Sequence, residues 1–401
     1  MLRHLLAYAL LGGAAPALPA GAAVLAVSLA QVPPARPHVA LGGRRHPGPL
    51  ATSYTIDDFG TPKNASLQNP DSLNNAGQIS GTEFNTQRHA YACVAFTGTH
   101  WVVLNPPKFA NCAPQAMNEP ASQTGPFSVV GYGQQTHGNV AFIASVSGNQ
   151  AKFTQVTTDA PTRLLGINDA GYAVGTAYRQ SGFFEQNPPY VLNGKTFAPL
   201  QPQCETFGPF CMSVVSVDAW TGPCPFGGCA ITDGNVVFGV DGQNSAQHYE
   251  VLTIGKSSSA QNLPMDPMAA PAAGINDALQ IAYAKLNGSG NYSAWQYTVG
   301  ASQPVALGTL PGSTCLNYNP ISENNAGDIL GDTPNCSGAA YWTWDPVNGM
   351  RDLDAEIPTN NYTQITPVGI NDSGQILVEL LKGNVVHWGL LKPSQPGKPG
   401  R

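Results

Sequence analysis

Short stretches of alternating apolar and polar residues recur between residues 53 and 392, and each follows a segment rich in Asn, Asp and Gly. The stretches 78–81, 172–175 and 375–378 have the period of two that predicts β-strands. Asn and Asp tolerate left-handed backbone and Gly adopts positive φ without steric cost, so the segments between them predict hairpin turns. After residue 30 there is no helical stripe, and the pattern predicts an all-β chain.

The turn segment recurs seven times along the chain. Its residues are Asn75 and Gly77; Asn168, Asp169 and Gly171; Asp233 and Gly234; Asn276 and Asp277; Asn325 and Gly327; and Asn371, Asp372 and Gly374. A weak copy near Phe127 completes the series. With the Gly positions aligned at 77, 127, 171, 234, 279, 327 and 374, the intervals are 50, 44, 63, 45, 48 and 47 residues. The 63-residue interval therefore predicts an insertion.

An aromatic residue follows each turn by 14 to 19 residues. These residues are Tyr91, Phe142, Tyr190, Tyr249, Trp295, Tyr341 and Trp388. Aromatic rings on an exposed face would suit stacking on sugars, but regular recurrence favours core packing. We expect all seven to fill equivalent core positions.

A repeat of about 45 residues with several short strands has the length of one four-stranded propeller blade. We therefore predict a seven-bladed β-propeller. Residues 53–60 precede the first turn and look like the last strand of a blade, whereas the seventh repeat ends after Trp388 without such a strand. We expect residues 53–59 to pair with residues 386–391 and close the ring.

The ends of the chain differ in composition from the repeats. Residues 1–30 carry Arg3, an Ala- and Leu-rich run and a small-residue cleavage site before Gln31, which predicts a signal peptide, with an uncleaved anchor as the alternative. Residues 31–50 are expected to be a flexible linker, 51–392 the propeller with a Cys-rich insertion at 202–229, and 393–401 a flexible tail.

All eight cysteines follow the leader, and an even number in an exported chain predicts disulfides. Local pairing gives Cys93 with Cys112 and Cys315 with Cys336. Four more lie in the insertion, namely Cys204, Cys211, Cys224 and Cys229. Their connectivity stays open, and a zinc site is the alternative, although the gaps of six, twelve and four residues lack a close Cys-x-x-Cys pair.

The repeat resembles the HAF-type extracellular repeat family, whose units join a turn like Ile-Asn-x-x-Gly-x-x-x-Gly to a strand like His-Ala-Phe-Leu-Trp and a closing Asp-Leu-Gly. In this chain 89–91 reads His-Ala-Tyr, 58–60 reads Asp-Phe-Gly and 307–310 reads Leu-Gly-Thr-Leu. The resemblance covers most of residues 53–392. It implies an exported repeat protein and no particular activity, so it assigns no functional residues.

Charged residues make up only 10% of the chain, and the formal net charge is −6. Because phosphate binding needs clustered Lys and Arg, we expect no nucleic-acid partner. Phosphate-binding loops, Gly-x-Ser-x-Gly and His-Glu-x-x-His are absent from the sequence, and we expect no cofactor or bound metal. Asp352, Asp354 and Glu356 alternate as a carboxylate pair would, but a solvated blade edge is the simpler interpretation.

These observations predict a monomeric, secreted or envelope protein that acts as a binding scaffold. The ligand, an extracellular glycan or a protein, would contact loops at one end of the ring or the 202–229 insertion. The alternatives are a polysaccharide-active enzyme with a site at the central channel and a structural envelope component. The sequence identifies no catalytic residue.

Overall fold

The computed structural model divides the chain into two units, residues 1–34 and 35–401, and the second unit contains all the described strands. The structure describes residues 49–394. Excepted are 63–64, 87–88, 105–108, 110, 136–137, 157–161, 178, 182–183, 187–188, 195, 200–211, 215–230, 244–245, 255–260, 265–271, 335, 337–339 and 359–360. The predicted leader, most of the linker and most of the tail lie outside the described residues.

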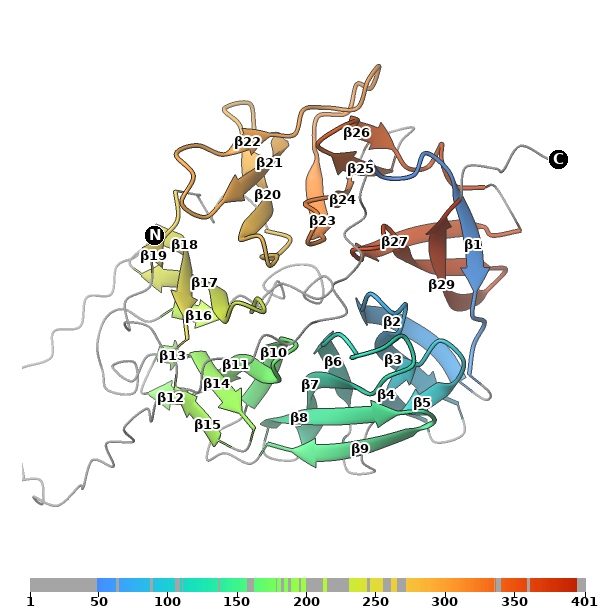
Figure 1. The fold of residues 1–401 in the computed structure, drawn as a ribbon, viewed down its shortest axis with the longest axis vertical. Helices are drawn as coiled ribbons and strands as arrows, with labels where there is room; N and C mark the ends of the chain where they lie inside the picture. Colours follow the sequence, from blue (N-terminus) through green and yellow to red (C-terminus); the bar gives the residue numbers. More distant parts are fainter. Residues whose placement is uncertain are drawn as a thin grey trace, which may run out of the picture. The chain divides into compact units, whose positions relative to one another are not determined.

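The described strands form six four-stranded sheets, one three-stranded sheet and one two-stranded sheet, and all the paired neighbours are antiparallel (Figure 1). The first sheets contain β2 Ala65–Leu73, β3 Ile79–Asn85, β4 Ala90–Phe96 and β5 Trp101–Val103, then β6 Cys112–Met117, β7 Phe127–Gln135, β8 Gly138–Ser147 and β9 Gln150–Gln155. The next contain β10 Thr162–Ile167, β11 Tyr172–Ala177, β14 Pro189–Asn193 and β15 Thr196–Pro199, with the hairpin β12 Arg179–Ser181 and β13 Phe184–Gln186. There follow β16 Met212–Val214, β17 Val236–Gln243, β18 Ala246–Thr253 and β19 Gln261–Asn262, then β20 Gln280–Leu286, β21 Tyr292–Thr298 and β22 Val305–Ala306.

The last two sheets complete the series. They contain β23 Asn319–Glu323, β24 Ile329–Asp332, β25 Tyr341–Asp345 and β26 Gly349–Asp352, then β27 Gln364–Ile370, β28 Ile376–Lys382, β29 Val385–Pro393 and β1 Tyr54–Asp58. This succession of four-stranded antiparallel sheets is the arrangement of a β-propeller, and the all-β prediction is confirmed. The described residues contain no helix long and apolar enough to cross a membrane.

In several sheets a glycine on the second strand, such as Gly131 on β7 and Gly331 on β24, lets the adjacent strands approach closely. A Cβ at Gly131 would lie 2.2 Å from the Ala113 carbonyl oxygen, and one at Gly331 would lie 2.0 Å from the Trp342 ring. The strand facing Gly131 has a register irregularity between Pro114 and Ala116, as expected where the backbone bulges toward its neighbour. A side chain at these glycines would push the strands apart.

The two ends of the described chain meet in one sheet. β1 pairs with β29 in a register that runs from Tyr54 opposite Pro393 to Asp58 opposite Gly389. In Figure 1, β1 accordingly lies beside β29. The predicted pairing of residues 53–59 with the end of the seventh repeat is present, and β29 continues one residue into the predicted tail.

The seven repeat aromatics do not share one environment. Phe142 and Trp388 are fully buried and Tyr249 is 4% exposed, but Tyr91 is 42% exposed, and Trp295 and Tyr341 are half-buried. The side chain of Tyr190 lies outside the described residues. The expectation of a common core position is therefore wrong for Tyr91.

Strand pairing shows that Tyr91 is not the equivalent of Phe142. Phe142 pairs with Gly131, and the equivalent residue in the first sheet is Val94, which pairs with Gly81. Tyr91 lies three residues before Val94. Both faces of β4 are buried from Ala92 to Phe96, so Tyr91 is exposed because it lies at the exposed beginning of the strand and not because of the face it occupies.

Two of the predicted disulfides are present. Cys93 on β4 bonds to Cys112 on β6, and Cys315 bonds to Cys336. Disulfides persist in oxidising compartments, so they indicate an extracellular or periplasmic environment. The other four cysteines, Cys204, Cys211, Cys224 and Cys229, lie outside the described residues.

The structure shifts two predicted boundaries. Met212–Val214 falls within the predicted 202–229 insertion but forms strand β16 of the fourth sheet and pairs with β17. This part of the predicted insertion therefore belongs to the repeat. Leu50, assigned by the sequence to the flexible linker, is 2% exposed and packs against Leu330 and Leu353, so the ordered part begins at or before Leu50.

Candidate functional site

The first Asn of each turn holds its own hairpin. In the third repeat the Asn168 side-chain oxygen accepts the Tyr172 amide at 2.9 Å, and the Asn168 carbonyl accepts the Gly171 amide at 2.9 Å. Asn74, Asn276, Asn324 and Asn371 make the same side-chain contact with the residue four positions on. The sequence-predicted turns are thus Asx-stabilised hairpins.

The second residue of each turn links it to the next repeat through one recurring hydrogen bond. A main-chain N–H donates to the side-chain oxygen of the equivalent residue in the following repeat, at 2.7–2.9 Å. The donors and acceptors are, in order, Asn75 to Glu119, Glu119 to Asp169, Asp169 to Asp233, Asp233 to Asp277, Asp277 to Asn325, Asn325 to Asp372, and Asp372 back to Asn75. We call the seven turns that contain these residues the linked turns, and the residues themselves their linking residues.

The second repeat was misaligned by the sequence, which placed its marker at Phe127. The structural equivalent of the first turn Asn is Asn118, whose side-chain oxygen accepts the Ser128 amide across a longer loop, and Glu119 occupies the linking position. The intervening loop contains extra residues, so the fixed turn spacing fails there. The sequence signal for Glu119 was an acid directly after Asn, as in Asn168-Asp169.

The fourth repeat is also corrected, by one residue. Thr232 replaces the first Asn, because its hydroxyl accepts the Val236 amide, and the left-handed residue is Asn235, with φ 61°. Gly234 therefore lies one position before the repeat's glycine, and this turn has full length. In the fifth repeat Leu279 takes the same left-handed position, with φ 60°, where other repeats use glycine.

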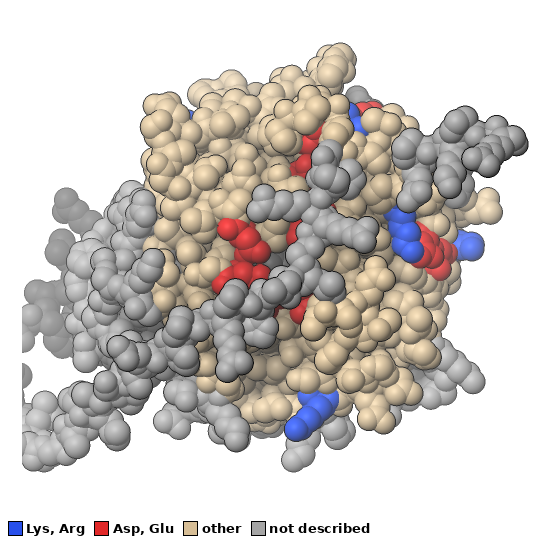
Figure 2. Space-filling view, in the orientation of Figure 1, with Lys and Arg blue, Asp and Glu red and all other residues tan. Residues whose placement is uncertain are grey.

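Five of the linked turns carry carboxylates: Glu119, Asp169, Asp233, Asp277 and Asp372. Among the described residues, none of these carboxylates forms an ion pair. Figure 2 shows acidic atoms gathered near the middle of the view, while the visible Lys and Arg lie farther out. The linked turns are therefore a locally negative surface without a cation among its described neighbours.

Burial and mutual repulsion raise the pKa of several of these acids. Burial, together with the neighbouring Asp233 charge, raises the pKa of Asp169 to about 7 and that of Asp277 to about 6. Burial also raises the pKa of Glu119 well above its ordinary value, although the Asn75 amide partly offsets this. Several carboxyls here thus titrate closer to neutral pH than free Asp or Glu.

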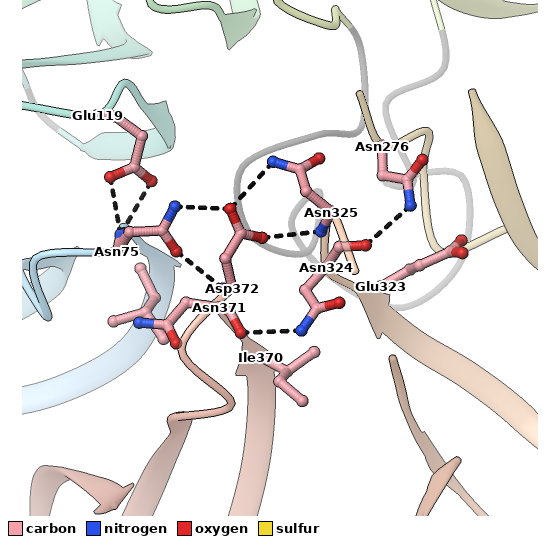
Figure 3. A pocket seen from close by; sticks show the side chains of 10 residues that line it. Asn75, Glu119, Asn276, Glu323, Asn324, Asn325, Ile370, Asn371 and Asp372 are labelled. Carbon is pink, nitrogen blue, oxygen red and sulfur yellow. Dashed lines mark hydrogen bonds between the residues drawn. The ribbon is translucent and has the colours of Figure 1, made fainter. Parts of the chain in front are cut away.

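A solvent-open pocket lies beside the linked turns, and Figure 3 shows its lining. It is lined by Leu73, Asn75, Glu119, Asn276, Glu323, Asn324, Asn325, Ile370, Asn371 and Asp372. The structure thus brings Asn75, Asn276, Asn325, Asn371 and Asp372, predicted as turn residues, into one site. The predicted glycines Gly77, Gly171, Gly327 and Gly374 adopt positive φ in their turns but do not line this pocket.

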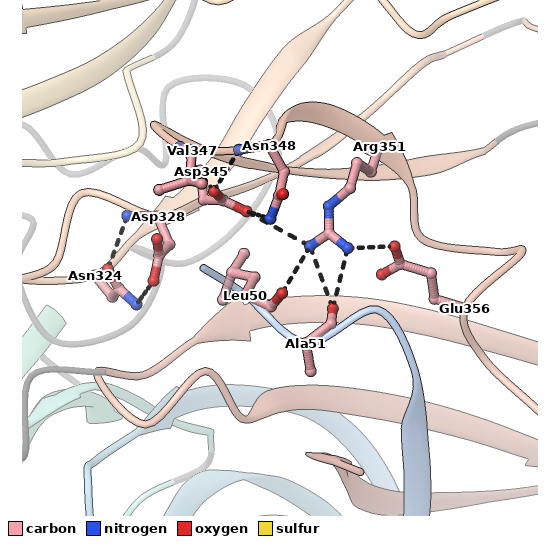
Figure 4. Close-up of polar contacts among 9 residues, drawn as sticks. All are labelled: Leu50, Ala51, Asn324, Asp328, Asp345, Val347, Asn348, Arg351 and Glu356. Carbon is pink, nitrogen blue, oxygen red and sulfur yellow. Dashed lines mark hydrogen bonds and ion pairs between the residues drawn. The ribbon is translucent and has the colours of Figure 1, made fainter. Parts of the chain in front are cut away.

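The alternating acids of the sixth repeat have structural partners. Asp352 accepts the Asp354 amide, and Asp354 accepts the Ala340 amide. Glu356 forms an ion pair with Arg351 at 2.6 Å, as Figure 4 shows. Each of the three acids therefore has a local structural partner. Within the described chain, no group of three or more His, Cys, Asp or Glu residues has the geometry to hold a metal.

Comparison with known proteins identifies propeller folds at low similarity. No protein-family model matches the chain, and no curated protein does. The β-propeller domain of the Trilobed protease from Pyrococcus furiosus is 8% identical over 76% of this chain and 97% of that domain, with a TM-score of 0.45. YCF48 bound to D1 peptide is 11% identical over 86% and 97%, with a TM-score of 0.47. At this level the similarity supports no activity or ligand, and the fold rests on the sheets themselves.

Two carboxyl-bearing residues of the pocket, Glu119 and Glu323, were not identified from the sequence. Glu119 was hidden by the longer loop of its repeat. Glu323 was visible in the repeat itself, because it occupies a position that is apolar in the other copies.

Proposed function

We propose that this chain is an exported, closed, seven-bladed β-propeller of the HAF-repeat kind that acts as a binding scaffold. Two observations support closure: β1 pairs with β29, and the hydrogen bonds of the linked turns return from Asp372 to Asn75. Seven linking positions support seven blades. The two disulfides support export, with the leader either cleaved or kept as an anchor.

The observation that carries the binding role is the pocket beside the linked turns. Its lining comes from the first, second, fifth, sixth and seventh repeats, so a ligand there would contact several blades at once. Loops on a rigid scaffold commonly carry binding function, and this surface is polar and open. The 202–229 segment, outside the described residues except for β16, remains a second proposed contact region.

A catalytic role has narrower support. Glu119, Glu323 and Asp372 bring carboxyl groups to one pocket, and glycoside hydrolases commonly use a pair of carboxyl groups. However, Glu119 and Asp372 each accept a main-chain amide of a neighbouring turn, so both are already committed to structure. Binding therefore fits the geometry better than acid–base chemistry.

A thermal-shift screen of the full chain tests this proposal, using oligosaccharides, polysaccharides, cationic peptides and divalent ions. A ligand at about 100 times its dissociation constant adds about 2.7 kcal/mol of stability. A saturable shift with any class supports a scaffold, and turnover of a shifting glycan would instead favour an enzyme. The absence of any shift would favour the structural envelope role.

A further inference from the structure

Asn is followed directly by Gly at three places in this chain: Asn193-Gly194, Asn287-Gly288 and Asn348-Gly349. In such a pair the main-chain nitrogen of Gly can attack the side-chain amide carbon of Asn, because no Cβ crowds the approach and the glycine backbone rotates freely. Asn193 ends β14, Asn348 lies in the turn between β25 and β26, and Asn287 lies in the hairpin between β20 and β21. All three asparagines are exposed, so exposure does not distinguish them.

The side-chain carbonyl of Asn287 is held by three hydrogen-bond donors. Its Oδ1 accepts the Ser289 amide at 3.0 Å, the Ser289 hydroxyl at 2.7 Å and the Asn291 amide at 3.0 Å. The Asn291 side-chain amide donates in turn to the Ser289 hydroxyl at 3.2 Å. Donors aimed at an oxygen stabilise the negative charge that develops on it during attack at the neighbouring carbon. The three hydrogen bonds therefore favour attack on the Asn287 amide carbon.

The nitrogen that would attack is unhindered. Within the described chain the Gly288 main-chain N–H donates no hydrogen bond, and a Cβ placed at Gly288 would meet nothing within 4 Å. The side-chain nitrogen of Asn287, which must leave, likewise donates to none of the described residues. Neither the attacking nor the leaving nitrogen is thus restrained by a partner in the hairpin.

The other two pairs are restrained. The side-chain nitrogen of Asn348 donates to Asp345 Oδ2 at 3.0 Å, and its main-chain amide donates to Asp345 Oδ1 at 2.8 Å. Gly349 begins β26 and pairs with Asp345, whose carboxylate would repel negative charge developing on the Asn348 oxygen. Asn193 lies within a four-stranded sheet and is paired on both sides. Asn287 is therefore the pair best arranged for reaction.

We propose that Asn287 is a site of spontaneous deamidation, activated by the donors of its own hairpin. The Gly288 nitrogen loses its proton to hydroxide and forms a bond to Asn287 Cγ. The Cγ–Nδ2 bond breaks, and the leaving nitrogen takes a proton from water and departs as ammonia. Water then opens the resulting succinimide at either carbonyl, which gives aspartate or isoaspartate at position 287. One water is consumed and one ammonia released, with no oxidation or reduction.

The modification would change an exposed hairpin in two ways. Either product adds a negative charge two residues after Lys285, whose ammonium lies over the Trp295 ring. Isoaspartate also lengthens the main chain by one methylene, at a residue whose N–H donates to the Asn291 carbonyl at 2.8 Å. This inference concerns a different part of the molecule from the linked turns and does not depend on the scaffold proposal.

Peptide mapping by mass spectrometry tests the proposal on the full chain, incubated folded at mildly alkaline pH. Asn287 should be converted at least about tenfold faster than Asn348 or Asn193, because only its oxygen is held by three donors. Isoaspartate should be among the products, since it forms through the ring. In guanidinium chloride at the same pH the three rates should converge. If the same order persisted in the unfolded chain, the hairpin would not be its cause and the proposal would fail.

Substitutions in the hairpin test the activating contacts. Ser289→Ala removes one donor and should slow the conversion of Asn287 at least about threefold. Ser289→Thr keeps the hydroxyl and is the matched control, which should react as wild type. Equal rates at Asn287 and Asn348 in the folded chain would overturn the proposal. An unchanged or faster conversion in Ser289→Ala would also overturn it, because the hydrogen bonds would then restrain the side chain and not activate it.

Discussion

Acidic side chains in two regions of this molecule experience opposite environments. In the linked turns Asp169 faces other acids, and burial and the Asp233 charge raise its pKa to about 7. At the terminal seam, where β1 meets β29, burial would by itself raise the pKa of Asp58, but hydrogen bonds from the Gly60 amide, His387 and Tyr362 lower it. Asp thus experiences electrostatic repulsion in the linked turns, whereas at the terminal seam it is stabilised by hydrogen bonds.

The terminal seam concentrates the ion pairs of the described chain. Lys392 pairs with Asp57, His387 with Asp58 at 2.9 Å, and Arg351 with Glu356 and Asp345. The Arg351 guanidinium also donates to the Leu50 and Ala51 carbonyls, which fixes the approach to β1 (Figure 4). Positive charge is scarce in this chain, and at the seam it joins residues far apart in sequence.

The largest expected effect is the loss of the Arg351 contacts. Arg351→Ala would leave Glu356 and Asp345, which are nearly buried, without their cation, and would free the carbonyls of residues 50 and 51. We expect the free energy of unfolding to fall by about 3–5 kcal/mol in urea denaturation. Arg351→Lys keeps the charge without the planar fork and should lose less. A loss below about 1 kcal/mol for the Ala variant would contradict an anchoring role.

Asp58→Asn should destabilise the protein by about 1.5–3 kcal/mol at pH 7, because charged hydrogen bonds from His387 and Tyr362 are weakened. The measurement is urea denaturation monitored by tryptophan fluorescence. Tyr362→Phe removes only one donor and serves as the graded control, with an expected loss of about 1 kcal/mol. An unchanged midpoint for Asp58→Asn would show that the seam does not depend on this carboxylate.

The same substitution in the linked turns should have the opposite sign. Asp169→Asn keeps the oxygen that accepts the Glu119 amide, as Asn75 and Asn325 do in their repeats, but removes the repulsion with Asp233. After allowance for solvent screening, we expect stabilisation by about 1 kcal/mol at pH 8 and little change at pH 5. Destabilisation at pH 8 would mean that the negative charge itself supports the turn.

The smallest effect is expected for Lys392→Ala. Lys392 and Asp57 are both 44% exposed at their side chains, so their ion pair should contribute less than about 1 kcal/mol and vanish in about 1 M salt. Thermal melts at low and high salt would measure this difference. A salt-independent loss would indicate that Lys392 acts through packing along β29 instead.

The sequence predicted the strands, the turns and the joining of the two ends because these depend on short-range chemistry repeated many times. A segment such as Asn-Asp-Ala-Gly favours a hairpin turn through local interactions alone. The partners of the two observed disulfides lie close in sequence, so their spacing was enough to predict them. Tyr91 was misplaced because a count of residues from the turn cannot show where the buried part of a strand begins, which on β4 is Ala92. Glu119 was missed for a related reason, since a longer loop displaced it from the fixed spacing.

The pocket could be predicted only in part. Its Asn and Asp residues carried a local turn signal, but their meeting in one site depends on how successive sheets stack. The linking bonds join residues 44 to 64 positions apart, and one spans 297. Glu323 was readable as a departure from the repeat, although its burial required the packed structure.

The most direct test of the difference between the acids of the linked turns and those of the terminal seam is a measurement of the free energy of unfolding between about pH 3 and pH 9. It compares wild type, Asp169→Asn and Asp58→Asn. A carboxyl with a raised folded pKa, such as Asp169 or Asp277, contributes its stability fully below about pH 4 and loses it as the pH rises through about 6 to 7. A carboxyl with a lowered pKa, such as Asp58, contributes above its ordinary value of 3.8 and loses that contribution as the pH falls through the lowered value.

Wild type should therefore gain stability as the pH falls from about 8 to about 5, and Asp169→Asn should flatten that gain. Asp58→Asn should also become more stable as the pH falls from about 8 to about 5, but its free energy of unfolding should stay below that of wild type. The difference between the two proteins should disappear in strong acid. Parallel curves for wild type and Asp169→Asn across this range would contradict the account that the linked turns hold unpaired, mutually repelling acids.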